Sequence, residues 1–175
     1  MMMITYNPAF DLYHAIFRMA HIVNKLDEGE SFEIERVRIW DYYLLFPDKV
    51  HTVTIRREEQ NLRDYRSQFL KKLNNPYEYK GNNQKLFEWI KPVQQSALSC
   101  MVSCGILDKE LYQRGRVGVA DRQMLTGFLL RAGNITDRER NVLSFMSLLS
   151  RHMPLTGIYG LKARTRLMES KYDAE

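Results

Sequence analysis

The stretch FEIERVRIWDYYLLFP, from Phe32 to Pro47, is the most apolar helical window of the chain. Its large apolar residues follow two helical stripes, one of Ile34, Val37, Trp40, Tyr43 and Leu44 and one of Ile39, Tyr42 and Phe46. Only a narrow strip around Arg36, Arg38 and Asp41 is left for water. A helix of this kind is buried, and each fully buried large side chain contributes about 1.5 to 3 kcal/mol. The stretch therefore predicts the central helix of a mainly α-helical fold.

The ends of this helix and its one carboxylate in the middle allow further predictions. Ser31 is the expected N-cap, and Pro47 ends the helix because proline cannot continue it. Asp41 is expected to form a buried ion pair, with Arg38 or with an arginine of another helix. We favour this structural role over general acid or base chemistry.

Length and composition predict one compact multi-helix domain with two lobes. The chain has 175 residues, of which 45% are hydrophobic, enough for a single core. The polar loop NNPYEYKGNN divides an N-terminal helical lobe, residues 1–76, from a winged-helix-like C-terminal lobe, residues 82–153, and a basic C-terminal tail follows at 154–175. No apolar run approaches the ~18 residues of a membrane span, and the start MMMITYNPAF does not resemble a signal peptide. We therefore expect a cytoplasmic protein with no membrane partner.

Further helices follow from apolar residues spaced three and four apart. They are expected at Pro8–Leu26, at Glu58–Leu73, from Asn82 or Asn83 to Cys104 with a kink or break near Lys91, at Arg122–Ala132, and after the capping box that Thr136 and Glu139 form. Val50–Ile55 reads either as a strand or as an extended connector.

Cysteine and histidine residues give no sign of a metal site. Cys100 and Cys104 lie one helical turn apart in an apolar window, which favours buried free thiols over a metal or redox pair. His14 and His21 lie two turns apart, so they are expected to be unconnected surface or groove histidines.

The segment after Gly105 is the most informative about topology. The segment follows the order of a winged-helix module with a short β-hairpin. This order is a helix that ends in glycine, the apolar pair Ile106 and Leu107, a turn, and a glycine-containing strand up to Val119. Only Arg114 and Arg116 lie on the expected wing. The polar face of the preceding helix has no positive charge and comprises Gln94, Gln95, Ser96, Ser99 and Ser103. We therefore favour protein contact over base readout for this module.

The tail carries a second group of cations. Lys162, Arg164 and Arg166 alternate along the segment after Gly160 and form a basic edge. This edge is either solvated or contacts an acidic partner surface or DNA. With the two arginines of the wing, these residues are the candidate contact sites.

Catalytic motifs were sought and none is present in the sequence. The chain has no phosphate-binding glycine loop, no nucleophile elbow and no cysteine with a predictable histidine partner. The net charge of +5 permits nucleic acid as a partner without requiring it. We therefore expect no enzymatic activity, no cofactor, no metal and no catalytic residue.

Three segments together resemble a known family. They are NPAFDLYHAIFRM (7–19), ERVRIWDYYLLFP (35–47) and GLKARTRLMESKYD (160–173), joined by NPYE, IKPVQQSAL, CGILD and GRVGV. This combination is similar to the middle components of bacterial ABC three-component conflict systems, the group that includes the small subunit of Lamassu-type anti-phage and anti-plasmid operons.

The resemblance implies a function that the residues alone do not reveal. It implies a non-enzymatic subunit that joins an SMC/Rad50-like ABC ATPase to an effector, commonly a nuclease or another toxic enzyme, and holds that effector in check. DNA would then be reached through the complex. The alternative is a free-standing winged-helix DNA-binding transcription regulator, which should gather lysine and arginine on its recognition helix and wing.

Overall fold

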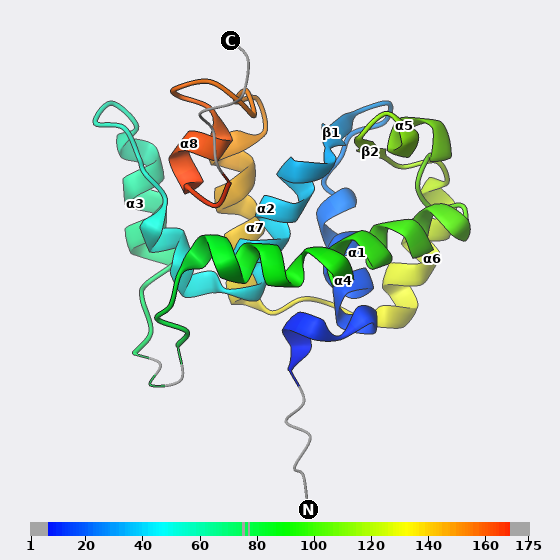
Figure 1. The fold of residues 1–175 in the computed structure, drawn as a ribbon, viewed down its shortest axis with the longest axis horizontal. Coiled ribbons are helices and arrows are strands. Elements are labelled where there is room, and N and C mark those ends of the chain that lie inside the picture. Colours follow the sequence, from blue (N-terminus) through cyan, green and yellow to red (C-terminus); the bar gives the residue numbers. More distant parts are fainter. Residues whose placement is uncertain (1–6, 75, 77, 169–175) are drawn as a thin grey trace, which may run out of the picture. The chain divides into compact units, whose positions relative to one another are not determined.

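The computed structural model describes residues 7–74, 76 and 78–168, and these residues are mainly helical (Figure 1). The elements in chain order are η1 (Pro8–Phe10), α1 (Leu12–Val23), β1 (Ser31–Glu33), α2 (Ile34–Leu45), η2 (Pro47–Thr52), α3 (Gln60–Phe69), α4 (Asn83–Ser103), α5 (Lys109–Gln113), β2 (Arg116–Gly118), α6 (Arg122–Ala132), α7 (Asp137–Ser150) and α8 (Leu161–Thr165). The predicted mainly α-helical class with a small antiparallel β-structure is confirmed.

The contacts group the chain into two compact units, each drawn from two separate stretches. Unit 1 comprises Met1–Arg38 and Trp89–Asn134, and unit 2 comprises Ile39–Glu88 and Ile135–Glu175. The prediction from sequence differs from this division, because each of its parts is one continuous stretch. These parts are the lobes at 1–76 and 82–153 and the tail at 154–175. Helices α2 and α4 each contribute residues to both units.

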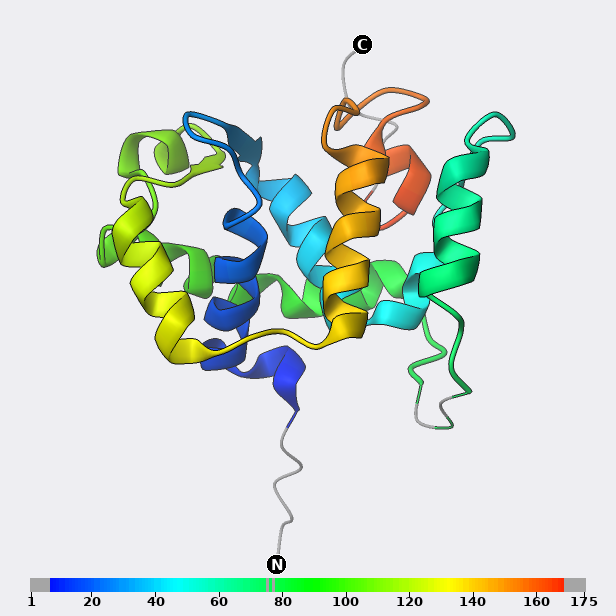
Figure 2. The same ribbon diagram turned by 180° about the vertical axis from the view of Figure 1, so that it is seen from behind.

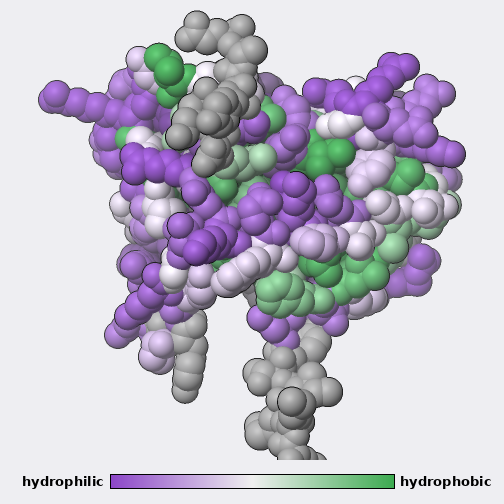
Figure 3. Space-filling model, in the orientation of Figure 1, coloured by the Kyte–Doolittle hydropathy of each residue, from purple (hydrophilic) through white to green (hydrophobic). Residues whose placement is uncertain are grey.

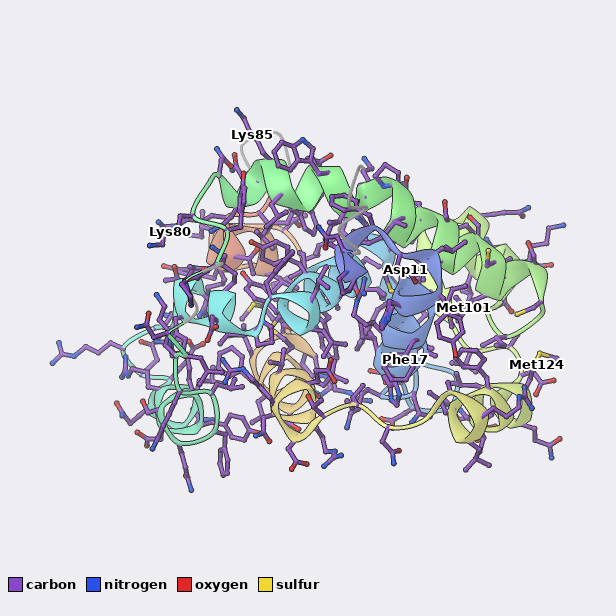
Figure 4. All side chains as sticks on the ribbon, turned by 90° about the horizontal axis from the view of Figure 1, so that it is seen from below. Asp11, Phe17, Lys80, Lys85, Met101 and Met124 are labelled. Atoms are coloured by element: carbon purple, nitrogen blue, oxygen red, sulfur yellow. The ribbon has the colours of Figure 1, made fainter. Side chains whose placement is uncertain are left out.

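In unit 1 a two-stranded sheet joins segments that are far apart in the sequence. Strand β1 pairs antiparallel with β2 in the register Ser31 to Gly118, and Leu107 forms a further antiparallel bridge with Val119. Helix α1 lies between α4 and α6 (Figure 4). The order α1, β1, α2, α4, Leu107, α5, β2 is compatible with the winged-helix-like part that the sequence predicts, with α5 in the expected wing. The winged-helix-like part itself stays a prediction.

Helix α4 ends as the sequence predicts. Gly105 has a φ of +88°, its N–H donates to Val102 O at 3.1 Å, and the N–H of Ile106 donates to Met101 O at 3.0 Å. These two bonds define a Schellman ending, which glycine favours because it has no Cβ. Pro92 lies inside α4, and the structure assigns one continuous helix there rather than two.

Unit 2 is built around the second part of α2. Helix α7 packs against α3 and η2 (Figure 2), and its capping box of Thr136 and Glu139 is present as predicted. Trp40 is fully buried, and its indole N–H donates to Ser150 Oγ at 2.8 Å. The rings of Tyr42 and Phe87 meet edge to face with centroids 5.9 Å apart. The prediction of a buried central helix is confirmed.

The expectation at the start of this helix is wrong. Ser31 is not an N-cap, because residues 31–33 form β1 and the N–H of Ile34 donates to Gly115 O at 3.0 Å. A backbone partner next to β2 therefore replaces the side-chain cap. Of the two alternatives for Val50–Ile55, the strand is not formed. Val50–Thr52 belong to the 3-10 helix η2, which begins at Pro47, and Val53–Ile55 form a connector.

The polar strip on α2 is buried, contrary to the expectation that it faces water. Arg36, Arg38 and Asp41 are 4%, 2% and 0% exposed. Arg36 pairs with Glu33 at 2.7 Å. Arg38 Nε donates to Gln94 Oε1 at 3.0 Å, and the Gln94 amide donates to Arg38 O at 3.1 Å. Gln94 is therefore buried as well and does not belong to the exposed face of α4.

Candidate partner-binding surfaces

The two arginines of the expected wing have different environments. The Arg116 guanidinium donates to Ser31 Oγ at 2.8 Å and to Ser31 O at 2.7 Å, so it ties β2 to β1. Arg114 follows α5, is exposed, and its side chain makes no ion pair within the described part of the chain. Of this pair, Arg114 is the cation available to a partner.

The outer face of α4 after Pro92 is uncharged. Gln95, Ser96, Ser99 and Ser103 are exposed as predicted. Trp89 is 55% exposed, and no charged residue occurs between Pro92 and Gly105. On the side drawn in Figure 3, hydrophobic side chains gather beside α4. Such a face lacks the charge that phosphate binding requires and is suited to contact with protein.

Both cysteines lie on this exposed face, so the prediction of buried thiols is wrong. Cys100 and Cys104 are free and exposed, and the Cys104 thiol donates to Met101 O at 3.4 Å. The apolar window that contains them is helical, but its buried side is formed by Ala97, Leu98 and Met101. The four-residue spacing of the two cysteines places them together on the opposite side.

The three cations of the expected tail do not form one exposed edge. The segment Leu161–Thr165 is helix α8, in which Lys162 and Arg164 are buried. Arg166 follows the helix, is exposed, and has a left-handed φ of 55°. Lys171, also expected in the tail, lies outside the described residues. Arg166 is therefore the exposed cation of this group.

Arg164 is held by a carboxylate that sequence reasoning did not single out. Its guanidinium binds Glu59 through two bonds, NH1 to Oε2 at 2.7 Å and NH2 to Oε1 at 2.9 Å, and NH1 also donates to Thr54 O at 3.1 Å. The hydrogen bonds from Arg164 lower the pKa of the Glu59 carboxyl below its ordinary value. The pair fixes α8 to the connector before α3. No local pattern links the two residues, since they are 105 positions apart.

The described residues show no metal centre. Residues 7–74, 76 and 78–168 contain no group of three His, Cys, Asp or Glu side chains able to hold a metal. His21 contacts Gly133 O through Nε2 at 3.1 Å, and it shares no such group with His14. One open pocket of about 380 Å³ is lined by Asn24, Thr126, Leu129, Leu130, Gly133 and Asn134, none of which titrates. Within the same ranges, no helix is both long and apolar enough to cross a membrane.

These features define a class of protein, a mainly helical protein in which two of the four candidate arginines, Arg116 and Arg164, bind its own backbone and the other two, Arg114 and Arg166, are exposed. The chain belongs to the family ABC-three component (ABC-3C) system Middle Component 5, whose profile matches residues 4–173. No curated protein and no solved structure matches it. The expected membership among middle components of ABC three-component systems is confirmed, whereas the Lamassu-type relationship stays a prediction.

Proposed function

We propose that this protein is the non-enzymatic middle subunit of a cytoplasmic anti-phage or anti-plasmid defence complex of the Lamassu type. In this role it bridges an SMC/Rad50-like ATPase and an effector, often a nuclease. The observation that carries the proposal is the family match over nearly the whole chain. The uncharged face of α4 supports it, because such a face favours contact with protein over contact with a phosphate backbone.

Two of the five candidate residues remain suited to partner contact. Arg114 and Arg166 are exposed and make no ion pair within the described ranges. Arg166 also holds a left-handed backbone conformation, which is unfavourable for a residue with a Cβ. This strain supports a function for the side chain of Arg166. Arg116 and Arg164 instead stabilise the fold, and Lys162 is buried.

The alternative is a free-standing winged-helix DNA-binding transcription regulator. The order of elements in unit 1 favours it, with α4 in the position of the recognition helix. The charge on α4 opposes it, because DNA affinity depends largely on phosphate contacts from lysine and arginine. On the expected wing, Arg114 is the arginine that makes no ion pair with a described residue.

The experiment that tests the proposal is co-expression with the other two components of the system. A tagged copy of this chain should co-purify with both, and omission of this chain should prevent the other two from associating. A chain that binds neither component, yet binds duplex DNA from its own promoter with sequence preference, would instead establish the regulator.

A further inference from the structure

We infer that one corner of unit 2 is a preformed anchor that inserts into an apolar pocket of a partner protein, next to a carboxylate of that partner. The corner comprises Arg56, Arg57, Ile158 and Tyr159, and we refer to it as the Tyr159 corner. The inference rests on the proposed function in that the partner is one of the other two components of the system. It adds the surface that is used and the chemistry of the surface that it meets.

The two apolar residues of the Tyr159 corner are largely exposed. Ile158 is 77% exposed and Tyr159 is 57% exposed, whereas Leu161, three residues beyond Ile158, is fully buried. A single exposed apolar residue is ordinary on a protein surface. An adjacent isoleucine and tyrosine at the tip of an ordered loop form a larger apolar feature, and tyrosine is among the residues that contribute most at interfaces.

The loop that carries these residues is held in one conformation. Gly157 adopts a φ of +89°, and the N–H of Gly160 donates back to Gly157 O at 3.0 Å. The N–H groups of Leu161 and Lys162 donate to Pro154 O and Leu155 O at 2.9 and 3.0 Å. The backbone passes so closely that a Cβ at Gly160 would collide with Thr156 O. A loop ordered in advance loses little conformational entropy when a partner binds.

Arginines from the connector before α3 complete the corner. The Arg56 guanidinium lies 4.5 Å from the centroid of the Tyr159 ring and pairs with Glu58 at 2.5 Å. Arg63 donates to the backbone carbonyls of Arg56 and Arg57, so the main chain there is fixed. The Arg57 side chain is exposed and makes no ion pair with any residue that the structure describes.

The charges at the corner favour a protein partner over nucleic acid. Glu58 pairs with Arg56, and Glu59 pairs with Arg164. Among the described residues, Arg57 is thus the cation of the corner that makes no ion pair, which matches one carboxylate and is too little for a phosphate backbone. One face of the Tyr159 ring is covered by Arg56, which hinders base stacking. An apolar pocket flanked by a carboxylate is complementary to this arrangement.

The test is a binding titration of the full chain against the purified ATPase component and the purified effector component. Ile158→Asp and Tyr159→Ala should each weaken binding to one component by about tenfold or more and leave the other affinity unchanged. Arg57→Glu should also weaken it, by a factor that shrinks as salt is raised. The thermal unfolding midpoint should stay at that of the parent for Ile158→Asp and Arg57→Glu, since these side chains are exposed, and should fall only slightly for Tyr159→Ala, which loses the contact with Arg56.

Matched controls come from the same unit. Lys85→Glu makes the same charge change as Arg57→Glu at an exposed cation, which projects from the first turn of α4 (Figure 4). Leu148→Asp introduces a charge at a leucine of α7 that is 58% exposed. Both controls should bind both components like the parent.

Each outcome decides between the two proposals. If the parent binds neither component, the proposed function fails, and the inference fails with it. If the parent binds and the Ile158, Tyr159 and Arg57 variants bind equally well, the inference alone is overturned. If the variants bind both components normally but lose affinity for a single-stranded or duplex oligonucleotide, the corner is a nucleic-acid site, which also overturns the inference.

Discussion

The indole of Trp40 shows how a single residue in the core stabilises the fold. Its side chain is fully buried and hydrogen-bonded to Ser150, so we expect Trp40→Ala to lower the free energy of unfolding by about 3 to 5 kcal/mol. Trp40→Phe should cost less, because most of the buried area remains and Ser150 still donates to Met146 O. Denaturant unfolding measures both. An unchanged midpoint for the alanine variant would contradict the buried position.

The exposure of Cys100 and Cys104 leads to a second prediction about single residues. Both are exposed, so both should react with an aromatic disulfide reagent in the native protein, without denaturant. Cys100→Ser and Cys104→Ser variants assign the two reactions, and each should lose one equivalent. Reaction that appears only after unfolding would support buried thiols instead.

The ion pair of Glu59 leads to a prediction of how the free energy of unfolding depends on pH. Its folded pKa lies below the ordinary value of 4.5, chiefly because Arg164 donates hydrogen bonds to it. The stabilisation that results is complete above about pH 4.5 and is lost as the pH falls through the lower, folded pKa. The parent should therefore be more stable than Glu59→Gln at neutral pH, and the difference should shrink below pH 4.5. Glu58→Gln, at an exposed ion pair, should behave like the parent. A constant difference between parent and Glu59→Gln down to pH 3 would contradict this role.

The exposure of a single residue was predictable where the apolar character of its side chain determines it. The exposure was unpredictable where a polar partner from a distant segment determines it. Trp40 and Tyr43 belong to an apolar stripe, and both are buried as that stripe predicts. Arg38 and Arg164 are buried because Gln94 and Glu59 meet them. A periodic pattern treats every arginine as solvent-facing, since it contains no information about groups that approach from other segments.

Among the elements, the end of α4 is a place where the backbone conformation of one residue, Gly105, affects the stability of the protein. Gly105→Ala should destabilise the protein by about 1 to 2 kcal/mol, because a residue with a Cβ is strained at the positive φ of this position. Gly127→Ala is the matched control, since Gly127 lies within α6 and only Arg131 lies near its missing Cβ. That change should be neutral or stabilising, because alanine is the better helix former. Equal effects of the two changes on the unfolding midpoint would contradict the Schellman ending.

The long helices were predictable and the short elements were not. Helices α1, α3, α4, α6 and α7 lie within or close to the ranges that apolar spacing predicts. Strand β1 has three residues, and its partner lies 85 positions away, so no local pattern reveals it. Helix α8 has five residues, and its attachment depends on Glu59. Short elements are fixed by tertiary contacts rather than by their own propensity.

For the whole molecule we expect no catalytic turnover. The described residues hold no metal cluster, and the sequence has no phosphate-binding loop. The purified chain should hydrolyse neither nucleoside triphosphates nor nucleic acid when magnesium or manganese is present. Turnover that co-purifies with the chain and disappears on a point substitution in it would contradict this prediction.

The composition of the two units leads to a prediction for a fragment of the chain. Because unit 1 needs Trp89–Asn134 as well as Met1–Arg38, a fragment of residues 1–76 should lack a cooperative thermal transition. The full chain should show one. Circular dichroism on both samples checks this. Cooperative unfolding of the fragment would instead support the lobe expected at 1–76.

The pairing of β1 with β2 also has a consequence for synthesis on the ribosome. The two strands lie 85 residues apart, and translation at about 5 to 20 residues per second leaves an interval of about 4 to 17 s between them. During this interval Phe32, which is buried in the finished protein, has no strand to cover it, and β1 is an open edge. The nascent chain is therefore exposed to aggregation at this edge until Gly118 has emerged, and a chaperone that binds short apolar segments would act on it within that interval.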